Sequence, residues 1–251
     1  MSAQTSPAIT LLTDFGTADG YVGEIKGVLL TRAPSVPLLD ITHDVPPHDV
    51  EFARLTLARY WRRFPTGTVH LCVVDPGVGG DRAAIAVASG GQYFVGPDNG
   101  LLSPALFALD ARVVALPVPL SAAATFHGRD VFAPAAAQLA VGTPLSDLGE
   151  SWGDPVRRRT PSPHRRHDGA IVGEVLTIDR FGNAITNLIA RAGGSVHVDA
   201  LTMPISRTYA DGMGSDPLAL VGSTGLIEIA IRDGNAARVL NLSRGTQVVL
   251  T

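Results

Sequence analysis

The sequence predicts an α/β protein: an N-terminal layered α/β/α domain with a mostly parallel sheet, followed by a small C-terminal all-β domain that forms a barrel. Two patterns predict this arrangement. Over the first 150 residues, short apolar runs alternate with longer segments whose apolar residues recur at helical spacing. After Gly169, short apolar runs follow one another between turn residues, without a convincing helix. With 251 residues, of which 45% are hydrophobic, the chain is long enough for one large domain or two smaller ones.

Strands and helices are expected to alternate in the first part of the chain. We expect strands at residues 8–13, 36–42, 69–74, 85–88, 93–95 and 112–116. Residues 19–32 and 131–141 have helical spacing. Asp49 is a suitable cap for a further helix that places four side chains inward: Phe52, Ala53, Leu57 and Trp61. The unbroken apolar run 69–74 suits a central strand of a parallel sheet, and Gly90-Gly91 predicts a hairpin.

The expected domain boundaries follow a change in composition. We expect the α/β domain over residues 1–150, a linker over 151–169 and the β-barrel domain over 170–251. The linker is rich in proline and arginine, and in a chain of net charge -3 a solvated loop is favoured over a nucleic-acid-binding tail. Barrel strands are expected at residues 170–178, 184–189, 195–198, 218–221, 226–231 and 246–250.

Composition argues against several classes of protein. The net charge of -3 disfavours a nucleic-acid binder, and the sequence has no run of about 18 apolar residues that would cross a membrane. The first ten residues lack the features of a signal peptide, and the single cysteine, Cys72, cannot form an internal disulfide. A cytoplasmic location is therefore expected. Cysteine and histidine do not cluster at zinc-ligand spacing, so no metal is expected.

Polar residues follow three of the expected strands. The runs 8–13, 36–42 and 69–74 lead into Asp14, His43 and Asp75. Ligands bind at the carboxyl ends of strands in open α/β sheets, so three such ends together favour a binding site over simple helix caps and turns. Asp75 begins a glycine-rich turn, across which Arg82 returns to face it. The two form either a catalytic pair or a purely structural ion pair.

Two further segments contain candidate site residues. His127 lies beside Gly128 just ahead of an apolar helix, where it is a natural proton acceptor or, equally, a plain surface residue. In the β region, Phe181 is suited to stack on a base and Asn183 to pair with its edge, although a plain hairpin turn explains this segment as well. The glycines after Asp75 do not have the spacing of a dinucleotide-binding loop.

Taken together, these segments resemble the S-adenosylmethionine hydroxide adenosyltransferase family, which is related to fluorinases and chlorinases. The resemblance covers nearly the whole chain. It rests on eight blocks, at residues 12–16, 19–23, 41–45, 74–79, 96–100, 126–130, 178–183 and 208–211. Each block is weak alone, but their order along the chain is specific. The resemblance implies the same α/β and barrel domains, assembled as a homotrimer with each active site between two subunits.

The same resemblance implies an activity, the hydrolysis of S-adenosyl-L-methionine to adenosine and L-methionine without a metal or cofactor. It identifies Asp75, Arg82 and His127 as a catalytic triad that halogenating relatives lack. Asp75 and His127 are expected to accept the proton of the attacking water, while Arg82 steadies its oxygen. The implied substrate-binding residues are Asp14 and His48 at the ribose, Asp19, Asp179 and Ser223 at the methionine part, and Phe181 and Asn183 at the adenine.

One departure and three alternatives remain open. Arg232 stands where relatives often have asparagine, at the rim of the implied adenine site. A halide is an alternative nucleophile, which would make the chain a 5′-halo-5′-deoxyadenosine synthase. A second alternative is a binding protein that senses S-adenosylmethionine or adenosine without cutting it. A third is a metal-dependent phosphohydrolase that uses Asp14, Asp75 and His127.

Overall fold

A seven-stranded sheet forms the centre of the first part of the chain. The computed structural model describes residues 8–189 and 193–251, and the chain divides into two units, of which the first ends at Arg159. Four strands of the sheet run parallel, in the order β2 (Leu38–Thr42), β1 (Ile9–Thr13), β3 (Val69–Val73) and β5 (Gln92–Pro97). The antiparallel strands β4 (Ala84–Ser89), β6 (Arg112–Ala115) and β7 (Glu150–Ser151) continue the sheet beyond β5. The central position expected for β3 and the hairpin at Gly90-Gly91 are confirmed.

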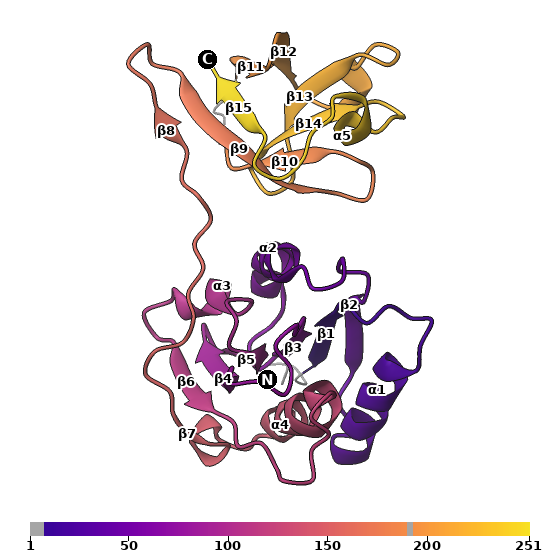
Figure 1. Ribbon diagram of the computed structural model, residues 1–251, viewed down its shortest axis with the longest axis vertical. Helices are drawn as coiled ribbons and strands as arrows, with labels where there is room; N and C mark the ends of the chain where they lie inside the picture. The colour runs from indigo at the N-terminus through magenta and orange to yellow at the C-terminus, as the bar shows by residue number, and fades with distance from the viewer. Residues whose placement is uncertain (1–7, 190–192) are drawn as a thin grey trace, which may run out of the picture. The chain divides into compact units, whose positions relative to one another are not determined.

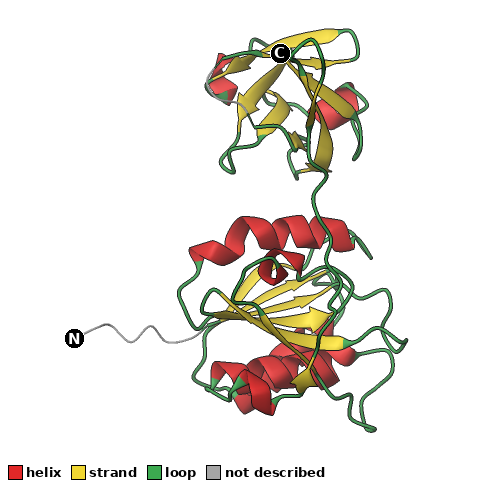
Figure 2. Ribbon diagram, turned by 90° about the vertical axis from the view of Figure 1, so that its left-hand side faces the viewer, coloured by secondary structure: helices red, strands yellow, loops and turns green. Residues whose placement is uncertain are grey.

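Helices cover both faces of this sheet (Figure 1 and Figure 2). One core joins the sheet to α1 (Tyr21–Arg32) and α4 (Ala133–Ala140), and a second joins it to α2 (Val50–Tyr60) and α3 (Ser103–Leu106). Alternate residues of a strand point to opposite faces, so Leu71 of β3 lies in the first core and Cys72 in the second. The predicted α/β/α layering is therefore confirmed.

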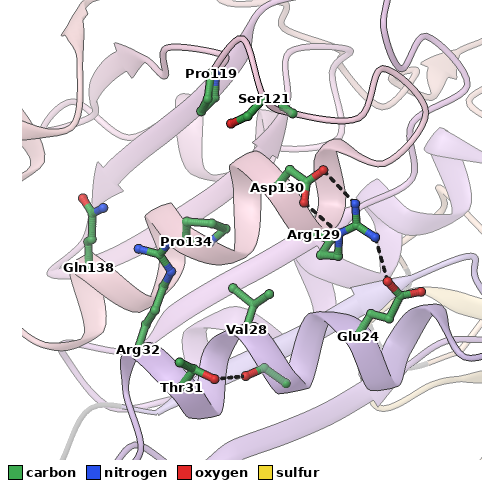
Figure 3. Close-up of a pocket in the computed structure, with 12 residues that line it drawn as sticks. Glu24, Val28, Thr31, Arg32, Pro119, Ser121, Arg129, Asp130, Pro134 and Gln138 are labelled. Atoms are coloured by element: carbon green, nitrogen blue, oxygen red, sulfur yellow. Dashed lines mark hydrogen bonds and ion pairs between the residues drawn. The ribbon is translucent and has the colours of Figure 1, made fainter.

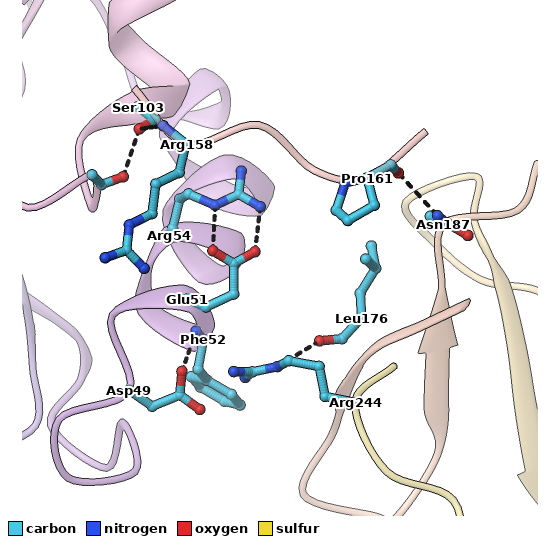
Figure 4. A network of polar contacts seen from close by, with 11 residues as sticks. Asp49, Glu51, Phe52, Arg54, Ser103, Arg158, Pro161, Leu176, Asn187 and Arg244 are labelled. Atoms are coloured by element: carbon cyan, nitrogen blue, oxygen red, sulfur yellow. Dashed lines mark hydrogen bonds and ion pairs between the residues drawn. The ribbon is translucent and has the colours of Figure 1, made fainter. Parts of the chain in front are cut away.

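Helix α2 begins where the sequence predicts. Oδ1 of Asp49 accepts a hydrogen bond from the backbone N–H of Phe52 at 2.9 Å, which caps the first turn (Figure 4). Ala53 and Leu57 are buried as expected, and Trp61 is buried in the 3-10 turn that follows, whereas Phe52 is only half-buried.

A histidine is buried in the middle of β3. His70 is fully buried, with Nδ1 2.8 Å from Oγ1 of Thr10 and Nε2 2.8 Å from Oε1 of Gln92. The amide oxygen of Gln92 accepts only, so Nε2 carries the ring proton and the Thr10 hydroxyl donates to Nδ1. Burial lowers the pKa of His70 to about 4, so the ring is neutral at pH 7.

The second unit contains a closed β-barrel. Seven strands follow one another around it, and pairing of the first with the last closes the ring: β10 (Ala184–Thr186), β14 (Ile227–Ile231), β13 (Pro217–Val221), β12 (Leu201–Ser206), β11 (Ser195–Val198), β15 (Gln247–Leu250) and β9 (Ile171–Ile178). The short strand β8 (His164–Arg165) pairs with β9 outside the ring. The predicted barrel is confirmed, with β12 as an additional strand and α5 (Ala236–Val239) as a short helix.

The first residues of the segment expected to be a linker are attached to the first unit. Asp98, at the end of β5, accepts hydrogen bonds from the indole N–H of Trp152 at 2.9 Å and from the backbone N–H of Val156 at 2.8 Å. The backbone N–H of Arg158 donates to Oγ of Ser103 at 2.8 Å (Figure 4). Residues 161–169 are exposed. None of the helices that the structure describes is long and apolar enough to cross a membrane.

Candidate active site

The carboxyl ends of β2, β1 and β3 lie side by side at one edge of the sheet, because these strands are parallel neighbours. Asp14 follows β1, His43 follows β2, and Asp75 follows Val74 at the end of β3. The first two ends are joined by a hydrogen bond of 2.8 Å from the backbone N–H of Gly16 to the carbonyl of His43. The clustering of strand ends expected from the sequence is therefore present.

The glycine-rich turn brings Asp75 close to the loop that carries His127. Gly79 has a positive φ of 76°, and a Cβ there would lie 2.4 Å from the carbonyl oxygen of Ala124. Only glycine permits this approach of the two loops. Behind the turn, Nδ2 of Asn99 donates to the carbonyl of Val74 at 2.8 Å and so fixes the backbone before Asp75.

Asp75, Arg82 and His127 form one connected cluster. Nε of Arg82 donates to Oδ1 and Oδ2 of Asp75 at 3.0 and 3.1 Å, and Nη2 of Arg82 donates to Oδ2 as well. The same Nη2 lies 2.9 Å from Nδ1 of His127. The cluster is buried, since the side chains of Asp75 and Arg82 are 6% and 10% exposed and His127 is 5% exposed. The structure thus unites the three residues of the predicted triad.

A cavity of about 450 Å³ opens beside this cluster. Its polar walls include Asp75, His127 and the ion pair of Glu24 with Arg129, in which the Arg129 Nη1–Glu24 Oε2 distance is 2.7 Å. Its apolar walls include three aromatic rings in edge-to-face contact, Phe15, Tyr21 and Phe126. Arg82 is not part of the lining; it lies behind Asp75 and His127, which are. The cavity therefore combines a buried charged cluster with apolar walls.

The electrostatics of this cavity favour a neutral histidine. Burial lowers the pKa of His127, and the positive charge of Arg82 lowers it further, although Asp75 and Asp130 act in the opposite direction. Asp130 itself is paired with Arg129, whose Nε lies 2.7 Å from its Oδ1. The Arg129–Asp130 ion pair also borders a neighbouring cavity of about 720 Å³ between α1 and α4. At this cavity, Arg129 lies between the carboxylates of Glu24 and Asp130 and is paired with both (Figure 3).

The other predicted residues of the first unit lie near the same strand ends. The backbone N–H of His48, a residue with positive φ, donates to Oδ2 of Asp14 at 2.8 Å. Asp19 is exposed just ahead of α1. The structure brings Asp14 and His48 together and leaves the Asp19 side chain in solvent.

The second unit arranges three predicted residues in one turn. The Asp179 carboxylate accepts hydrogen bonds of 2.9 Å from the backbone N–H groups of Phe181 and Asn183 and from Nδ2 of Asn183. Phe181 is left 75% exposed at a cavity of about 760 Å³, whose lining also includes Asn183, Tyr209 and Arg232. Ser223 is exposed in the turn after β13 and is not among the residues that line this cavity.

The backbone of this turn requires glycine at position 182. Gly182 has a φ of 86°, and a Cβ there would lie 2.1 Å from Cγ of Asn235. We expect Gly182→Ala to lower the free energy of unfolding by about 1–3 kcal/mol for the strained φ and by about 1–3 kcal/mol more for the collision. Gly214→Ala is the matched control, because its φ is 57° but its Cβ would meet open space. Urea unfolding of both variants measures the difference, and equal losses would contradict the collision.

Several residues of the site escape prediction from the sequence. The ion pair of Glu24 with Arg129 joins residues far apart in the chain, and Asn99 acts through the backbone of Val74. Tyr21 and Phe126 lie inside the sequence blocks that carry the family resemblance, so the resemblance was the one indication that these two rings line the cavity. Within residues 8–189 and 193–251, no group of three or more His, Cys, Asp or Glu residues is placed to hold a metal ion.

Fold and site together define a class of two-domain proteins, in which a three-layer α/β domain with a buried Asp–Arg–His cluster precedes a closed β-barrel. The N-terminal domain model of the S-adenosylmethionine hydroxide adenosyltransferase family matches residues 9–149, and its C-terminal domain model matches residues 173–249. The chain belongs to this family, and the resemblance inferred from the sequence blocks is confirmed.

Individual relatives cover almost the whole chain. The chain is 43% identical to an (R)-S-adenosyl-L-methionine hydrolase of Thermus thermophilus, over 96% of this chain and 98% of that protein. It is also 43% identical to an (R)-S-adenosyl-L-methionine hydrolase of Salinispora arenicola, over 98% of each chain. A fluorinase of an Actinoplanes species is 28% identical over 100% of this chain and 99% of the fluorinase. Among solved structures, an uncharacterized conserved protein from Thermotoga maritima is similar with a TM-score of 0.87 and 33% identity, over 96% of this chain and 99% of that one.

Proposed function

We propose that this chain hydrolyses S-adenosyl-L-methionine to adenosine and L-methionine by in-line displacement at C5′ of the ribose. The observation that carries the proposal is the buried cluster of Asp75, Arg82 and His127 beside a partly apolar cavity at the carboxyl edge of the sheet. Relatives that are 43% identical over almost the whole chain are named as hydrolases of this compound, whereas the fluorinase relative is 28% identical.

In this reaction the nucleophile needs activation and the leaving group does not. The leaving group is a neutral thioether, which departs without an acid catalyst. Hydroxide and sulfonium have opposite charges that cancel as the C5′–O bond forms, so a water-poor cavity strengthens their attraction. Holding the two reactants in line contributes up to about 7–11 kcal/mol. A cavity that fixes a nucleophile beside the ribose therefore supplies most of what this reaction needs.

The remaining site residues are proposed from the family resemblance. Asp14 and His48 contact the ribose, and Asp19, Asp179 and Ser223 contact the amino and carboxylate groups of the methionine part. Phe181 stacks on the adenine, and Asn183 offers the adenine edge its amide oxygen and the Nδ2–H that is not bonded to Asp179. The enzyme uses no metal or cofactor, acts in the cytoplasm and assembles as a homotrimer with active sites at subunit interfaces. Light scattering of the purified protein tests the trimer.

Product analysis in isotopically labelled water tests the proposed reaction. The protein is incubated with S-adenosyl-L-methionine in ¹⁸O-water, with chloride or fluoride present in parallel samples, and the products are separated and weighed by mass spectrometry. We expect adenosine that carries ¹⁸O at its 5′-oxygen, together with unlabelled methionine, at the same rate with or without a chelator. A 5′-halo nucleoside would assign the chain to the halogenases. Tight binding without any product would make it a binding protein.

The stacking role of Phe181 predicts a change in KM. We expect Phe181→Ala to raise the KM for S-adenosyl-L-methionine about tenfold, because a stacked base contributes about 1–3 kcal/mol. Stacking acts on substrate and transition state alike, so kcat should change little. Met213→Ala is the control, because Met213 is 79% exposed on the same unit and lies outside the Phe181 cavity. An unchanged KM for Phe181→Ala would remove Phe181 from the substrate site.

A further inference from the structure

A glutamate on β14 is buried on the outer face of the barrel. Glu228 is only 6% exposed. Its two neighbours on the strand, Ile227 and Ile229, lie in the core of the barrel, and alternate residues of a strand point to opposite faces, so Glu228 points away from that core. In the pairing of β14 with β13 it lies opposite Leu220, which belongs to a small buried apolar cluster. The carboxylate therefore lies beside apolar side chains rather than in solvent.

Two other segments cover this carboxylate. Oη of Tyr209 donates a hydrogen bond of 2.8 Å to Oε2 of Glu228. Oε1 lies against the turn after β13, where a Cβ on Gly222 would be 1.9 Å from it, so only glycine permits this approach. Within residues 8–189 and 193–251, the Tyr209 hydroxyl is the one group that hydrogen-bonds to the Glu228 carboxylate, and no lysine or arginine pairs with it.

Stability alone does not account for this arrangement. Burying a carboxylate costs free energy unless it is paired and hydrogen-bonded, and Glu228 has a single neutral donor. An apolar side chain of similar length, such as methionine, would pack beside Leu220 without that cost. Buried polar groups that a core does not need are typical of functional sites. The contact of Glu228 with Tyr209 is therefore the place to look for its role.

Tyr209 connects the buried carboxylate to the cavity beside Phe181. It lines that cavity together with Phe181 and Asn183, and it is 42% exposed. Because its hydroxyl is held by Glu228, the ring cannot turn freely about its side-chain bonds. A side chain that is ordered before a ligand binds loses no rotamer freedom on binding, which contributes about three- to tenfold in affinity.

We propose that Glu228 is a positioning residue: its buried carboxylate holds the ring of Tyr209 at the Phe181 cavity, in place for a flat heteroaromatic ring of the ligand. The inference rests on the proposed function, in which this cavity receives the adenine of S-adenosyl-L-methionine. Glu228 acts through Tyr209 rather than by touching the ligand. Its contact with Gly222 also places it beside the turn that carries Ser223, so one carboxylate joins two parts of the barrel that the proposed substrate contacts.

The affinity for adenosine tests this role. Adenosine contains the adenine ring but neither the methionine part nor a bond that reacts, and titration calorimetry measures its Kd. We expect Glu228→Met and Tyr209→Phe each to raise this Kd about three- to tenfold, because each frees the ring. Glu228→Gln keeps an oxygen that accepts from Tyr209 and should stay within about twofold of the unmodified protein. A Kd that Glu228→Met leaves unchanged, or that Glu228→Gln raises as much, overturns the inference.

A double variant and urea unfolding separate positioning from a purely structural role. Glu228→Met combined with Tyr209→Phe should bind adenosine no more weakly than either single variant, because both changes remove the same hydrogen bond. Glu228→Met should be at least as stable as the unmodified protein, since it removes a buried carboxylate. A purely structural role predicts the reverse, a lost stability and an unchanged Kd in the folded protein. Losses that multiply in the double variant would also overturn the inference.

Gly222→Ala displaces the carboxylate without changing Glu228 or Tyr209. The new Cβ would take the place of Oε1, so the Kd for adenosine should rise as it does in Glu228→Met. A shift of Ser223 alone would leave this Kd unchanged, because Ser223 is assigned to the methionine part that adenosine lacks. Gly153→Ala is the control, since a Cβ there meets open space. An unchanged Kd in Gly222→Ala would contradict the inference, and this variant tests it even if Glu228→Met fails to fold.

Turnover gives a further readout. Glu228→Met should raise the KM for S-adenosyl-L-methionine by the same factor as the Kd for adenosine, with little change in kcat, because the ring contacts substrate and transition state alike. The proposed function and this inference fail separately. If the unmodified protein forms no adenosine, the proposed reaction is wrong, while the Kd values still test Glu228. If adenosine forms but the Kd values do not follow the expected pattern, the reaction stands and the role of Glu228 is wrong.

Discussion

Arg82→Met is expected to lower kcat by about 10²–10³-fold and to lower the free energy of unfolding by about 3–5 kcal/mol. The first effect arises because Arg82 bonds both Asp75 and His127, so its loss leaves these two side chains without the contact that holds them together. The second arises because Asp75 would remain buried with an unpaired charge. Steady-state kinetics and urea unfolding measure the two effects. A variant with nearly full turnover would refute the triad.

A double variant separates the catalytic effect from the stability effect. Asp75→Asn combined with Arg82→Met removes both charges, so most of the lost stability should return while turnover stays low. Arg166→Met is the control for removing an arginine from an ion pair, because Arg166 and Asp168 are 53% and 54% exposed. We expect it to leave both quantities nearly unchanged, since exposed ion pairs contribute little. Recovery of turnover in the double variant would show that the cluster acts only as a structural ion pair.

Local sequence patterns predict most of the fold because most helices and strands have the residue spacing, burial pattern and caps that are typical of such elements. The run at β3 is apolar throughout, which is what a strand covered on both faces requires, and Asp49 lies where a helix start needs an acceptor. Strand β12 was missed because Pro204 interrupts it and proline lacks the N–H of a ladder. The structure tolerates Pro204 opposite Ser195 in the pairing with β11.

The site was predictable only in part, because its contacts depend on tertiary structure. Asp75 and Arg82 are separated by a short glycine-rich turn, so their pairing follows from local geometry. His127 is 45 residues beyond Arg82, and no local pattern gives that contact; the family resemblance supplied it. The direction of the Arg82–His127 hydrogen bond is a property of the folded cluster alone. Arginine can only donate, so Nδ1 of His127 accepts from Nη2 of Arg82, and this arrangement could not be derived from the sequence.

Acid is expected to destabilise the first unit through His70. Its folded pKa of about 4 lies below the unfolded value of 6.5, so the neutral ring stabilises the fold above pH 6.5, and this contribution is lost as the pH falls from 6.5 to 4. The difference amounts to about 3 kcal/mol at 1.36 kcal/mol per pKa unit. The cost arises because a charged ring would be fully buried and would lose the hydrogen bond that Nδ1 accepts from Thr10.

Carboxylates titrate in the same range, so the test compares variants rather than pH values alone. His70→Gln cannot acquire the buried charge, and its free energy of unfolding should be below that of the unmodified protein at pH 7 but should approach it as the pH falls to 4.5. His167→Asn is the control, because His167 is exposed and its loss should leave the pH dependence unchanged. A constant difference between His70→Gln and the unmodified protein at all pH values would contradict this role. Because His70 lies on β3, the strand that leads to Asp75, loss of activity in acid would then follow from unfolding of the sheet.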